Sequence, residues 1–431
     1  MSMPNELNFG GARPLRGRLR LPGDKSISHR ALLFAALATG RSSIANLSTG
    51  DDVRATRAAL TALGVSIRAG RDSVNVNANG LGAWHEPEEP IDCANSGTTM
   101  RVLAGAVAAC DFLSVLTGDA SLRHRPMRRV TEPLRAMGAH LDGRDGGSFA
   151  PLAIRGAALH GMTHELTVPS AQVKSALMVA GLHADGVTEV ISPAPSRDHT
   201  ERMLAALGAP VETEPGRVRV KAGAPQPFEL EVPGDPSSAA FFVVAALITP
   251  GSSLTIESLA CNPTRLGFVD VLRRMGGDIE IEPAGERCGE PVGDLRVRAS
   301  ALAATTIEGD EIPNVQDEVP ALAVAAAFAE GVTEVRDAAE LAVKESNRIG
   351  ALHQELSELG LAVEPRGDGL VIRGGKPRAA LLKSHGDHRI AMAAAVAANA
   401  IDGESTVRGW RAVASSYPGF ADDFARVTGQ S

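Results

Sequence analysis

The chain has 431 residues, of which 44% are hydrophobic and 22% charged, a balance far from that of intrinsically disordered chains. Its formal net charge of −8 and its low aromatic content of 3% argue against a nucleic-acid partner. No apolar run approaches the roughly 18 residues that span a bilayer, and no secretory signal is visible, so we expect a cytoplasmic protein with no membrane partner.

The first predicted element begins at Leu21 with LPGDKSISHRALLFAALATGRSSI, and Val232 opens a close copy, VPGDPSSAAFFVVAALITPGSSLTI. Looser copies begin at Asp92, Val168, Ile312 and His385. Between the copies, five of six units carry an amphipathic helix closed by Gly, such as FVDVLRRMGGDI, before a strand resumes. The sequence therefore predicts six α/β units of about 70 residues each.

The first helix of each unit is apolar nearly all round and is predicted to be buried, whereas the second has one polar face. Because the first and fourth units match best, we place a duplication boundary near Glu231, with three units in each lobe. The predicted domains are residues 22–231 and residues 1–21 plus 232–431. The alternative is an ordinary doubly wound α/β protein, in which helices and strands alternate without a duplication.

Cations precede the apolar stretches of these first helices, which contain no Lys or Arg themselves. Arg30, Arg101, Lys174 and Arg389 lie at or near predicted helix starts, where the helix dipole makes a cation unfavourable. An anionic ligand would explain their placement, because helix N-termini with added cations bind phosphate or carboxylate. Further cations in the loops enlarge the set: Lys25, Arg125, Arg197, Lys344 and Arg348. We expect these residues to converge between the lobes on a polyanion; the alternative is solvated surface charge.

Acidic and hydroxyl residues are interleaved with the cations. Those that could serve as helix N-caps are Asp24, Ser26, Ser170, Asp235, Asp317 and Asp387. Asp317 and Glu345 are the candidates for acid and base catalysis, since Lys344 and Arg348 flank Glu345 and favour its ionised form. No phosphate-binding loop, HExxH motif or paired Cys and His ligands occur, and the four cysteines are scattered. We therefore expect neither a cofactor nor a metal.

Eight segments resemble the EPSP synthase (3-phosphoshikimate 1-carboxyvinyltransferase) family, in the same order along nearly the whole chain. They are GDKSISHRALLFAA at Gly23, NSGTTMR at Asn95, RPM at Arg125, PSAQVKSA at Pro169, SRDHTERM at Ser196, the Asp317 loop, VKESNRIG at Val343 and GDHRIAMA at Gly386. The resemblance implies an α/β fold of two lobes in an inside-out α/β barrel arrangement, with three βαβαββ units per lobe. It also implies transfer of enolpyruvyl from phosphoenolpyruvate to the 5-hydroxyl of shikimate 3-phosphate, in a monomer that glyphosate inhibits.

The resemblance also implies a role for each matching residue. Contacts to shikimate 3-phosphate fall on Lys25, Ser26, Arg30, Ser170, Gln172, Ser196 and Lys344, and Lys25 also touches phosphoenolpyruvate. Phosphoenolpyruvate contacts fall on Arg125, Arg348, Arg389 and the backbone near Gly97. Asp317 would take the proton of the attacking hydroxyl, and Glu345, with Lys25, would manage the proton at the methylene carbon.

The sequence departs from the family's pattern at Ala171, Asn347 and Ser415, where many members have Ser, Asp and Lys. Two rival functions remain. One is the related enolpyruvyl transferase that acts on UDP-N-acetylglucosamine, which has GxKN near its start and a cysteine where this chain reads TGDASLRHRPM. The other is a clamp of repeated units around DNA, which would carry cations along its inner helices.

Overall fold

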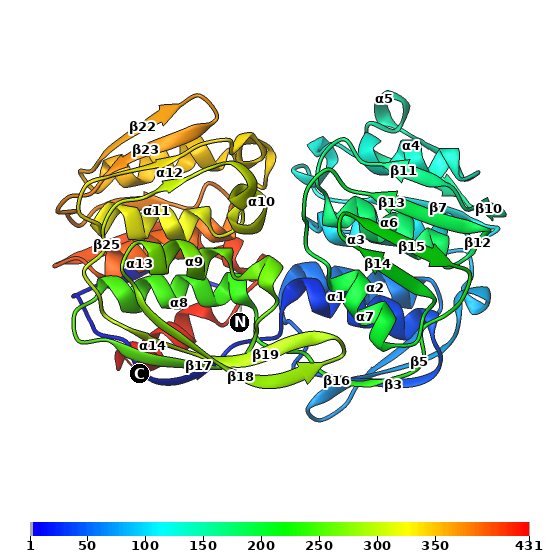
Figure 1. Cartoon of the computed structure of the whole chain (residues 1–431), viewed down its shortest axis with the longest axis horizontal. Helices are drawn as coiled ribbons and strands as arrows, with labels where there is room; N and C mark the ends of the chain where they lie inside the picture. Colours follow the sequence, from blue (N-terminus) through cyan, green and yellow to red (C-terminus); the bar gives the residue numbers. More distant parts are fainter. Residues whose placement is uncertain (1–2, 431) are drawn as a thin grey trace. The chain divides into compact units, whose positions relative to one another are not determined.

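The computed structural model describes residues 3–430. The chain forms two compact units (Figure 1). The first unit comprises Met1–Pro22, Pro233–Gly285 and Pro291–Ser431, and the second comprises Gly23–Val232 and Glu286–Glu290. Both units mix parallel and antiparallel strand pairs with helices, so the predicted α/β class is confirmed.

In the second unit, three four-stranded sheets share one order, in which the first two strands are parallel and the other pairs are antiparallel. Their strands, in sheet order, are β16 (Glu229–Glu231), β3 (Thr39–Ala45), β5 (Ser73–Asn79) and β4 (Ser66–Ala69); β6 (Ile91–Asp92), β7 (Leu113–Thr117), β9 (Phe149–Arg155) and β8 (His140–Gly143); and β11 (Thr163–Glu165), β13 (Val187–Ile191), β15 (Arg217–Lys221) and β14 (Val211–Glu214). A short parallel pair is formed by β10 (Leu159–His160) and β12 (Ala184–Asp185).

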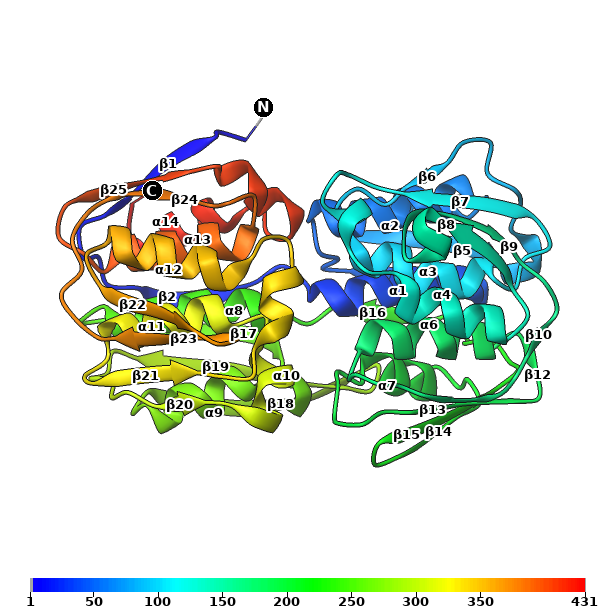
Figure 2. The ribbon, with the colours of Figure 1, turned by 90° about the horizontal axis from the view of Figure 1, so that it is seen from above.

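Three buried helices form the centre of the second unit: α1 (Lys25–Leu37), α3 (Gly97–Val107) and α6 (Ala171–Gly181). They are rich in Ala and Gly, and the small side chains allow close approach. A Cβ at Gly105 of α3 would lie 2.1 Å from the carbonyl oxygen of Ala176 in α6, so this crossing requires glycine. Figure 2 shows β7 and β13 on opposite sides of α3 and α6.

The remaining helices of this unit are partly exposed. They are α2 (Asp51–Ala62), α4 (Arg128–Ala136), α7 (His199–Ala206), the short α5 (Arg144–Gly147), and the 3-10 turns η1 (Leu81–Ala83) and η2 (Leu122–His124).

The first unit has two four-stranded sheets and one three-stranded sheet among the described residues, apart from the tips of two strands at residues 286–290, which belong to the second unit. Their strands, in sheet order, are β18 (Asp278–Arg287), β19 (Glu290–Arg298), β17 (Ser253–Ala260) and β2 (Arg16–Arg20); β20 (Thr306–Ile307), β21 (Val332–Val335), β23 (Gly369–Arg373) and β22 (Ala362–Arg366); and β1 (Glu6–Gly10), β25 (Glu404–Arg408) and β24 (Leu381–Lys383). Strands β1 and β2 thus pair with strands from much later in the sequence.

The centre of the first unit is again a set of three buried helices in mutual contact: α8 (Pro236–Ile248), α11 (Val319–Phe328) and α13 (His388–Asn399). A cluster of aromatic rings, which includes Phe9, Phe242 and Trp410, packs against α14 (Phe420–Thr428). The other helices are α9 (Gly267–Arg274), α12 (Arg348–Glu358), the short α10 (Ile312–Val315), and the turns η3 (Pro263–Arg265), η4 (Gly309–Glu311), η5 (Ala339–Val343) and η6 (Trp410–Ser415).

Four of the cations lie near the starts of buried helices, as predicted. Arg30, Arg101, Lys174 and Arg389 fall within the first two turns of α1, α3, α6 and α13. The free cysteines Cys93 and Cys110 are buried, and Cys261 and Cys288 are partly buried. Within residues 3–430, no helix combines the length and apolar character needed to cross a bilayer.

Candidate active site

Polar caps fix the N-termini of the buried helices. Asp24 accepts a hydrogen bond from the amide of Ile27, and Asp387 accepts one from the amide of Arg389, each over 2.8 to 2.9 Å. Ser170 and Asp235 cap their helices in the same way, as predicted. The prediction of a cap is wrong at two positions: Ser26 lies inside α1, and Asp317 precedes Glu318, which is the N-cap position of α11.

In the second unit, Arg30 is buried, and each of its three nitrogens donates to a hydroxyl or carbonyl oxygen. Its Nε donates to Thr200 Oγ1 over 2.7 Å, Nη2 to Ser175 Oγ over 2.7 Å, and Nη1 to the carbonyl of Ser26 over 2.9 Å. Burial lowers the pKa of Arg30 to about 10, although Glu201 and Asp24 oppose the shift. Arg30 is therefore a charged group in a fixed orientation at neutral pH.

Two lysines of this unit are held by carboxylates. Lys25 Nζ lies 2.8 Å from Asp52 Oδ2, and Lys174 forms an ion pair with Glu201 in which both side chains are buried. Each pair joins a buried helix to an outer one, because Asp52 belongs to α2 and Glu201 to α7. The paired carboxylates compensate the burial of these cations.

Gly97 begins α3 beside two arginines. A Cβ built on Gly97 would lie 2.7 Å from Arg101 Nη1 and 3.4 Å from Arg125 Nη1. Arg101 Nη1 donates to Gln172 Oε1 over 2.6 Å, and Arg125 Nη2 donates to Asn95 Oδ1 over 2.6 Å. Gly97 is not among the glycines with positive φ, so its backbone conformation is open to other residues.

Ser170 and Ser196, predicted to bind the substrate, differ in their surroundings. Ser170 Oγ accepts the amide of Val173 over 3.4 Å as the cap of α6. The hydroxyl of Ser196 is buried and has no hydrogen-bond partner among the described residues. An unsatisfied buried hydroxyl is uncommon in native proteins.

In the first unit, three cations surround Asp317. Its carboxylate lies 3.3 Å from Arg348 Nη1, 3.7 Å from Arg389 Nη2 and 3.8 Å from Lys344 Nζ. Arg389 Nη1 also donates to the carbonyl of Asp317 over 2.9 Å. The side chain of Asp317 is 18% exposed, which leaves it accessible.

Arg348 connects Asp317 to Glu345. Its Nη2 donates to Glu345 Oε2 over 2.7 Å, and its Nε donates to the buried Asp387 over 2.8 Å. Although burial acts in the opposite direction, Asp387, Glu345 and Asp317 together raise the pKa of Arg348. Glu345 is thus paired with Arg348 as predicted, whereas the ion pair of Lys344 is with Asp317.

The predicted site residues divide between the two units, and we call each set the cluster of its unit. Lys25, Ser26, Arg30, Gly97, Arg125, Ser170, Gln172 and Ser196 belong to the second unit, and Asp317, Lys344, Glu345, Arg348 and Arg389 belong to the first. Sequence reasoning missed the residues that hold these groups: Asp52, Ser175, Thr200, Glu201, Arg265 and Glu318. Ser175, Thr200 and Glu201 did lie in two of the quoted segments, PSAQVKSA and SRDHTERM, but no role was predicted for them. The described residues contain no group of three His, Cys, Asp or Glu side chains suited to a metal ion.

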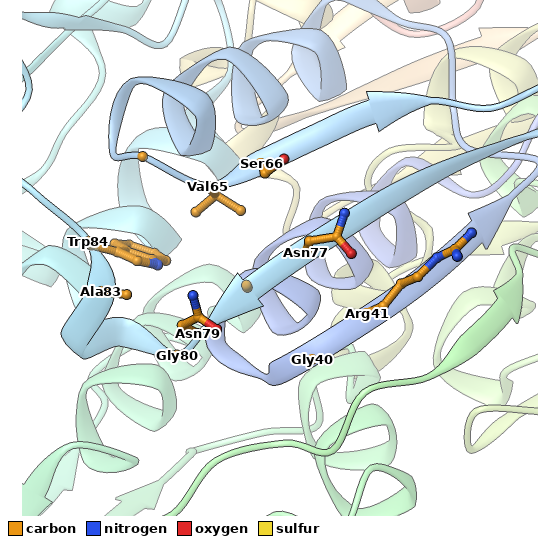
Figure 3. A pocket seen from close by; sticks show the side chains of 11 residues that line it. Gly40, Arg41, Val65, Ser66, Asn77, Asn79, Gly80, Ala83 and Trp84 are labelled. Atoms are coloured by element: carbon orange, nitrogen blue, oxygen red, sulfur yellow. The ribbon is translucent and has the colours of Figure 1, made fainter.

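A hollow of about 510 Å³ on the second unit lies outside both clusters (Figure 3). Arg41, Asn77 and Asn79 line it together with Val65 and Trp84. It contains none of the predicted site residues.

Comparison with known proteins decides the family. The sequence profile of EPSP synthase (3-phosphoshikimate 1-carboxyvinyltransferase) matches residues 10–424. The chain belongs to the EPSP synthase family. Curated relatives named 3-phosphoshikimate 1-carboxyvinyltransferase include those of Roseiflexus castenholzii, 50% identical over 96% of this chain and 98% of the relative, and Pelotomaculum thermopropionicum, 50% identical over 98% and 99%.

Solved structures agree with this assignment. EPSP synthase from Acinetobacter baumannii superposes with a TM-score of 0.88 at 39% identity, covering 98% of both chains. The enolpyruvyl transferase NikO from Streptomyces tendae has a TM-score of 0.80 at 20% identity, covering 98% of this chain and 97% of its own, and shares the fold. The resemblance of the eight segments to the EPSP synthase family is confirmed.

Proposed function

We propose that the chain transfers the enolpyruvyl group of phosphoenolpyruvate to the 5-hydroxyl of shikimate 3-phosphate and releases phosphate, a step of the shikimate pathway. Membership of the EPSP synthase family supports this reaction. The observation that carries it in the structure is the pair of carboxylates, Asp317 and Glu345, that share Arg348 among further cations. Such a group can move protons beside anionic substrates.

The cluster of the second unit is proposed to bind shikimate 3-phosphate. Arg30 presents a fixed guanidinium, and the hydroxyls of Ser26, Ser170 and Ser196 with the amide of Gln172 supply hydrogen bonds to phosphate and ring. The unsatisfied Ser196 hydroxyl supports a ligand contact there. Lys344 of the first unit is assigned to the same substrate.

Phosphoenolpyruvate is proposed to be held by Arg125, Arg348, Arg389 and the backbone near Gly97, with Lys25 touching both substrates. Guanidinium groups suit phosphate and carboxylate because they offer paired donors. Gly97 is the first residue of α3, and the amides at a helix N-terminus suit a phosphate.

The chemistry then requires two proton movements. Asp317 takes the proton of the 5-hydroxyl as its oxygen bonds to C2 of phosphoenolpyruvate, while the methylene carbon gains a proton from Glu345 or Lys25. The resulting tetrahedral intermediate loses phosphate as the same carbon returns a proton, which restores the double bond. The proton that the carbon returns restores Glu345 or Lys25, and the proton held by Asp317 leaves with the phosphate.

The finer architecture is part of the proposal: two lobes of three βαβαββ units each, in an inside-out α/β barrel. The shared strand order of the four-stranded sheets supports a repeated unit. We further propose a cytoplasmic monomer that binds neither nucleic acid nor membranes.

The test is a phosphate-release assay with shikimate 3-phosphate and phosphoenolpyruvate, singly and together, with excess chelator. We expect phosphate only when both substrates are present, at a rate unaffected by the chelator. Release from phosphoenolpyruvate alone, or none with both, would contradict the proposed reaction, and loss of activity on chelation would contradict the expectation that no metal is needed.

A further inference from the structure

Buried polar and charged side chains of the first unit form a chain that leads to Arg389. Arg265 Nη2 donates to Asp235 Oδ1 over 3.1 Å and to Ser237 Oγ over 2.9 Å. The hydroxyl of Ser237 donates to Glu318 Oε1, and the same oxygen lies 3.9 Å from Arg389 Nη1. Negative and positive groups therefore alternate from the start of α8 to the start of α13.

Glu318 has no exposed surface, and the Arg265 side chain is 2% exposed. A buried carboxylate is costly unless cations and hydrogen-bond donors compensate it. Glu318 occupies the N-cap position of α11 but makes no side-chain cap hydrogen bond to that helix. Its carboxylate instead engages Ser237 and Arg389, so helix capping does not account for this anion.

Arg389 lies between two carboxylates. Its Nη1 faces Glu318 and the carbonyl of Asp317, and its Nη2 lies 3.7 Å from the Asp317 carboxylate. If Asp317 were the only anion near Arg389, Asp317 and Arg389 would pair more closely. Arg389 would then be less available to a substrate. Asp317 would be a weaker base, because a closer cation lowers the pKa of a carboxylate.

We propose that Glu318 is a positioning residue that holds Arg389 in place for the anionic group of phosphoenolpyruvate, an inference that rests on the proposed function. Glu318 and Asp317 both attract the Arg389 guanidinium. Arg389 therefore does not pair fully with Asp317, the proposed base. Ser237 donates to the Glu318 carboxylate, and Arg265 in turn donates to Ser237.

The test compares Glu318→Gln, which keeps the shape and removes the charge, with the wild type. We expect the KM for phosphoenolpyruvate to rise about tenfold and kcat to fall, while the KM for shikimate 3-phosphate changes less than twofold. Glu318→Asp, which keeps the charge at a shorter length, should recover part of the loss. A loss of stability alone would not raise the KM for phosphoenolpyruvate while leaving the KM for shikimate 3-phosphate nearly unchanged.

Glu355→Gln is the matched control, because Glu355 is also a buried carboxylate of the first unit, held by the amide of Lys383 and by His385. Equal increases in the phosphoenolpyruvate KM for Glu318→Gln and Glu355→Gln, or no increase for Glu318→Gln, would overturn the proposal. If Glu318→Gln does not fold, Ser237→Ala and Glu318→Asp are measured instead. An unchanged KM for phosphoenolpyruvate in both variants would overturn the proposal.

Calorimetric titration with phosphoenolpyruvate, in the presence of shikimate 3-phosphate and at a temperature that suppresses turnover, separates this inference from the proposed function. A wild type that binds the anion but releases no phosphate would refute the reaction alone. Weaker binding by Glu318→Gln than by the wild type would then still support the positioning role, and equal binding would refute it.

Discussion

Arg348 donates its Nε proton to Asp387 over 2.8 Å, and both side chains are buried. The Asp387 carboxylate therefore fixes the guanidinium plane through Nε. The two Nη atoms donate to Asp317 and Glu345. Although burial raises it, Arg348 holds the pKa of Asp387 below its usual value. The pair stays ionised at the pH at which the enzyme would work.

Asp317→Asn and Glu345→Gln should each lower kcat on the order of 100-fold or more, because each removes a group that is proposed to move a proton. Binding of shikimate 3-phosphate should change little, as measured by calorimetry. Glu364→Gln, an exposed carboxylate of the same unit, is the control and should leave both quantities unchanged. Near wild-type kcat in either site variant would remove that residue from the mechanism.

Arg30→Lys should raise the KM for shikimate 3-phosphate about tenfold while kcat changes less. Arginine here donates from three nitrogens to three oxygens, and a single ammonium cannot replace this pattern. Steady-state kinetics with Arg41→Lys as an exposed control checks the effect. If the KM is unaltered, Arg30 has a structural role only.

Gly97→Ala should raise the glyphosate inhibition constant by a larger factor than the KM for phosphoenolpyruvate, because the family's inhibitor is longer than the substrate. The added methyl would press on the Arg101 guanidinium at 2.7 Å, which is the mobile end of a side chain and can shift. Since Gly97 does not require positive φ, the fold should persist.

Both constants and a melting curve should be measured for Gly97→Ala beside Gly82→Ala, which meets nothing within 4 Å. Equal factors for inhibitor and substrate would argue against a close approach of the ligand to Gly97. A large loss of melting temperature in Gly97→Ala alone would show that its effect is on folding.

His183→Gln should reduce the loss of stability in acid. Burial lowers the pKa of His183 to about 4, and its Nε2 has no hydrogen-bond partner among residues 3–430. Below about pH 6.5 the unfolded chain binds a proton that the folded chain does not, so wild-type stability falls as the pH falls toward 4. Between pH 7 and pH 4.5, the free energy of unfolding of the wild type should fall by about 2 kcal/mol more than that of His183→Gln.

Chemical denaturation at the two pH values measures this gain, with His140→Gln as an exposed control. If stability depends on pH in the same way in both variants, His183 is not the buried neutral group that causes the loss of stability in acid.

Local signals predicted much of this structure. The PGD sequence identified Asp24 and Asp235 as caps, and the Ala-rich runs identified the buried helices. The groups that hold the site cations were not predictable, because they come from other elements. Asp52 reaches Lys25 from α2, and Arg265 meets Asp235 from a turn with no periodic pattern.

Asn347 shows why a departure from a motif can be neutral for the fold. Its side chain caps α12 by accepting the amide of Gly350 over 3.2 Å, a role that Asp also fills. This cap and the tertiary contacts of the neighbouring Glu345 and Arg348 had to come from the structure.

The pairing of β1 with β25 bears on the order of folding during synthesis. Glu6 lies opposite Arg408, so this ladder cannot form until almost the whole chain has left the ribosome. The sheets of the second unit, in contrast, are complete once Glu231 has been made. Loop closure over such a separation is slow, so we expect the second unit to become protease-resistant early. Residues 6–20 should remain unpaired until their partner strands have been made.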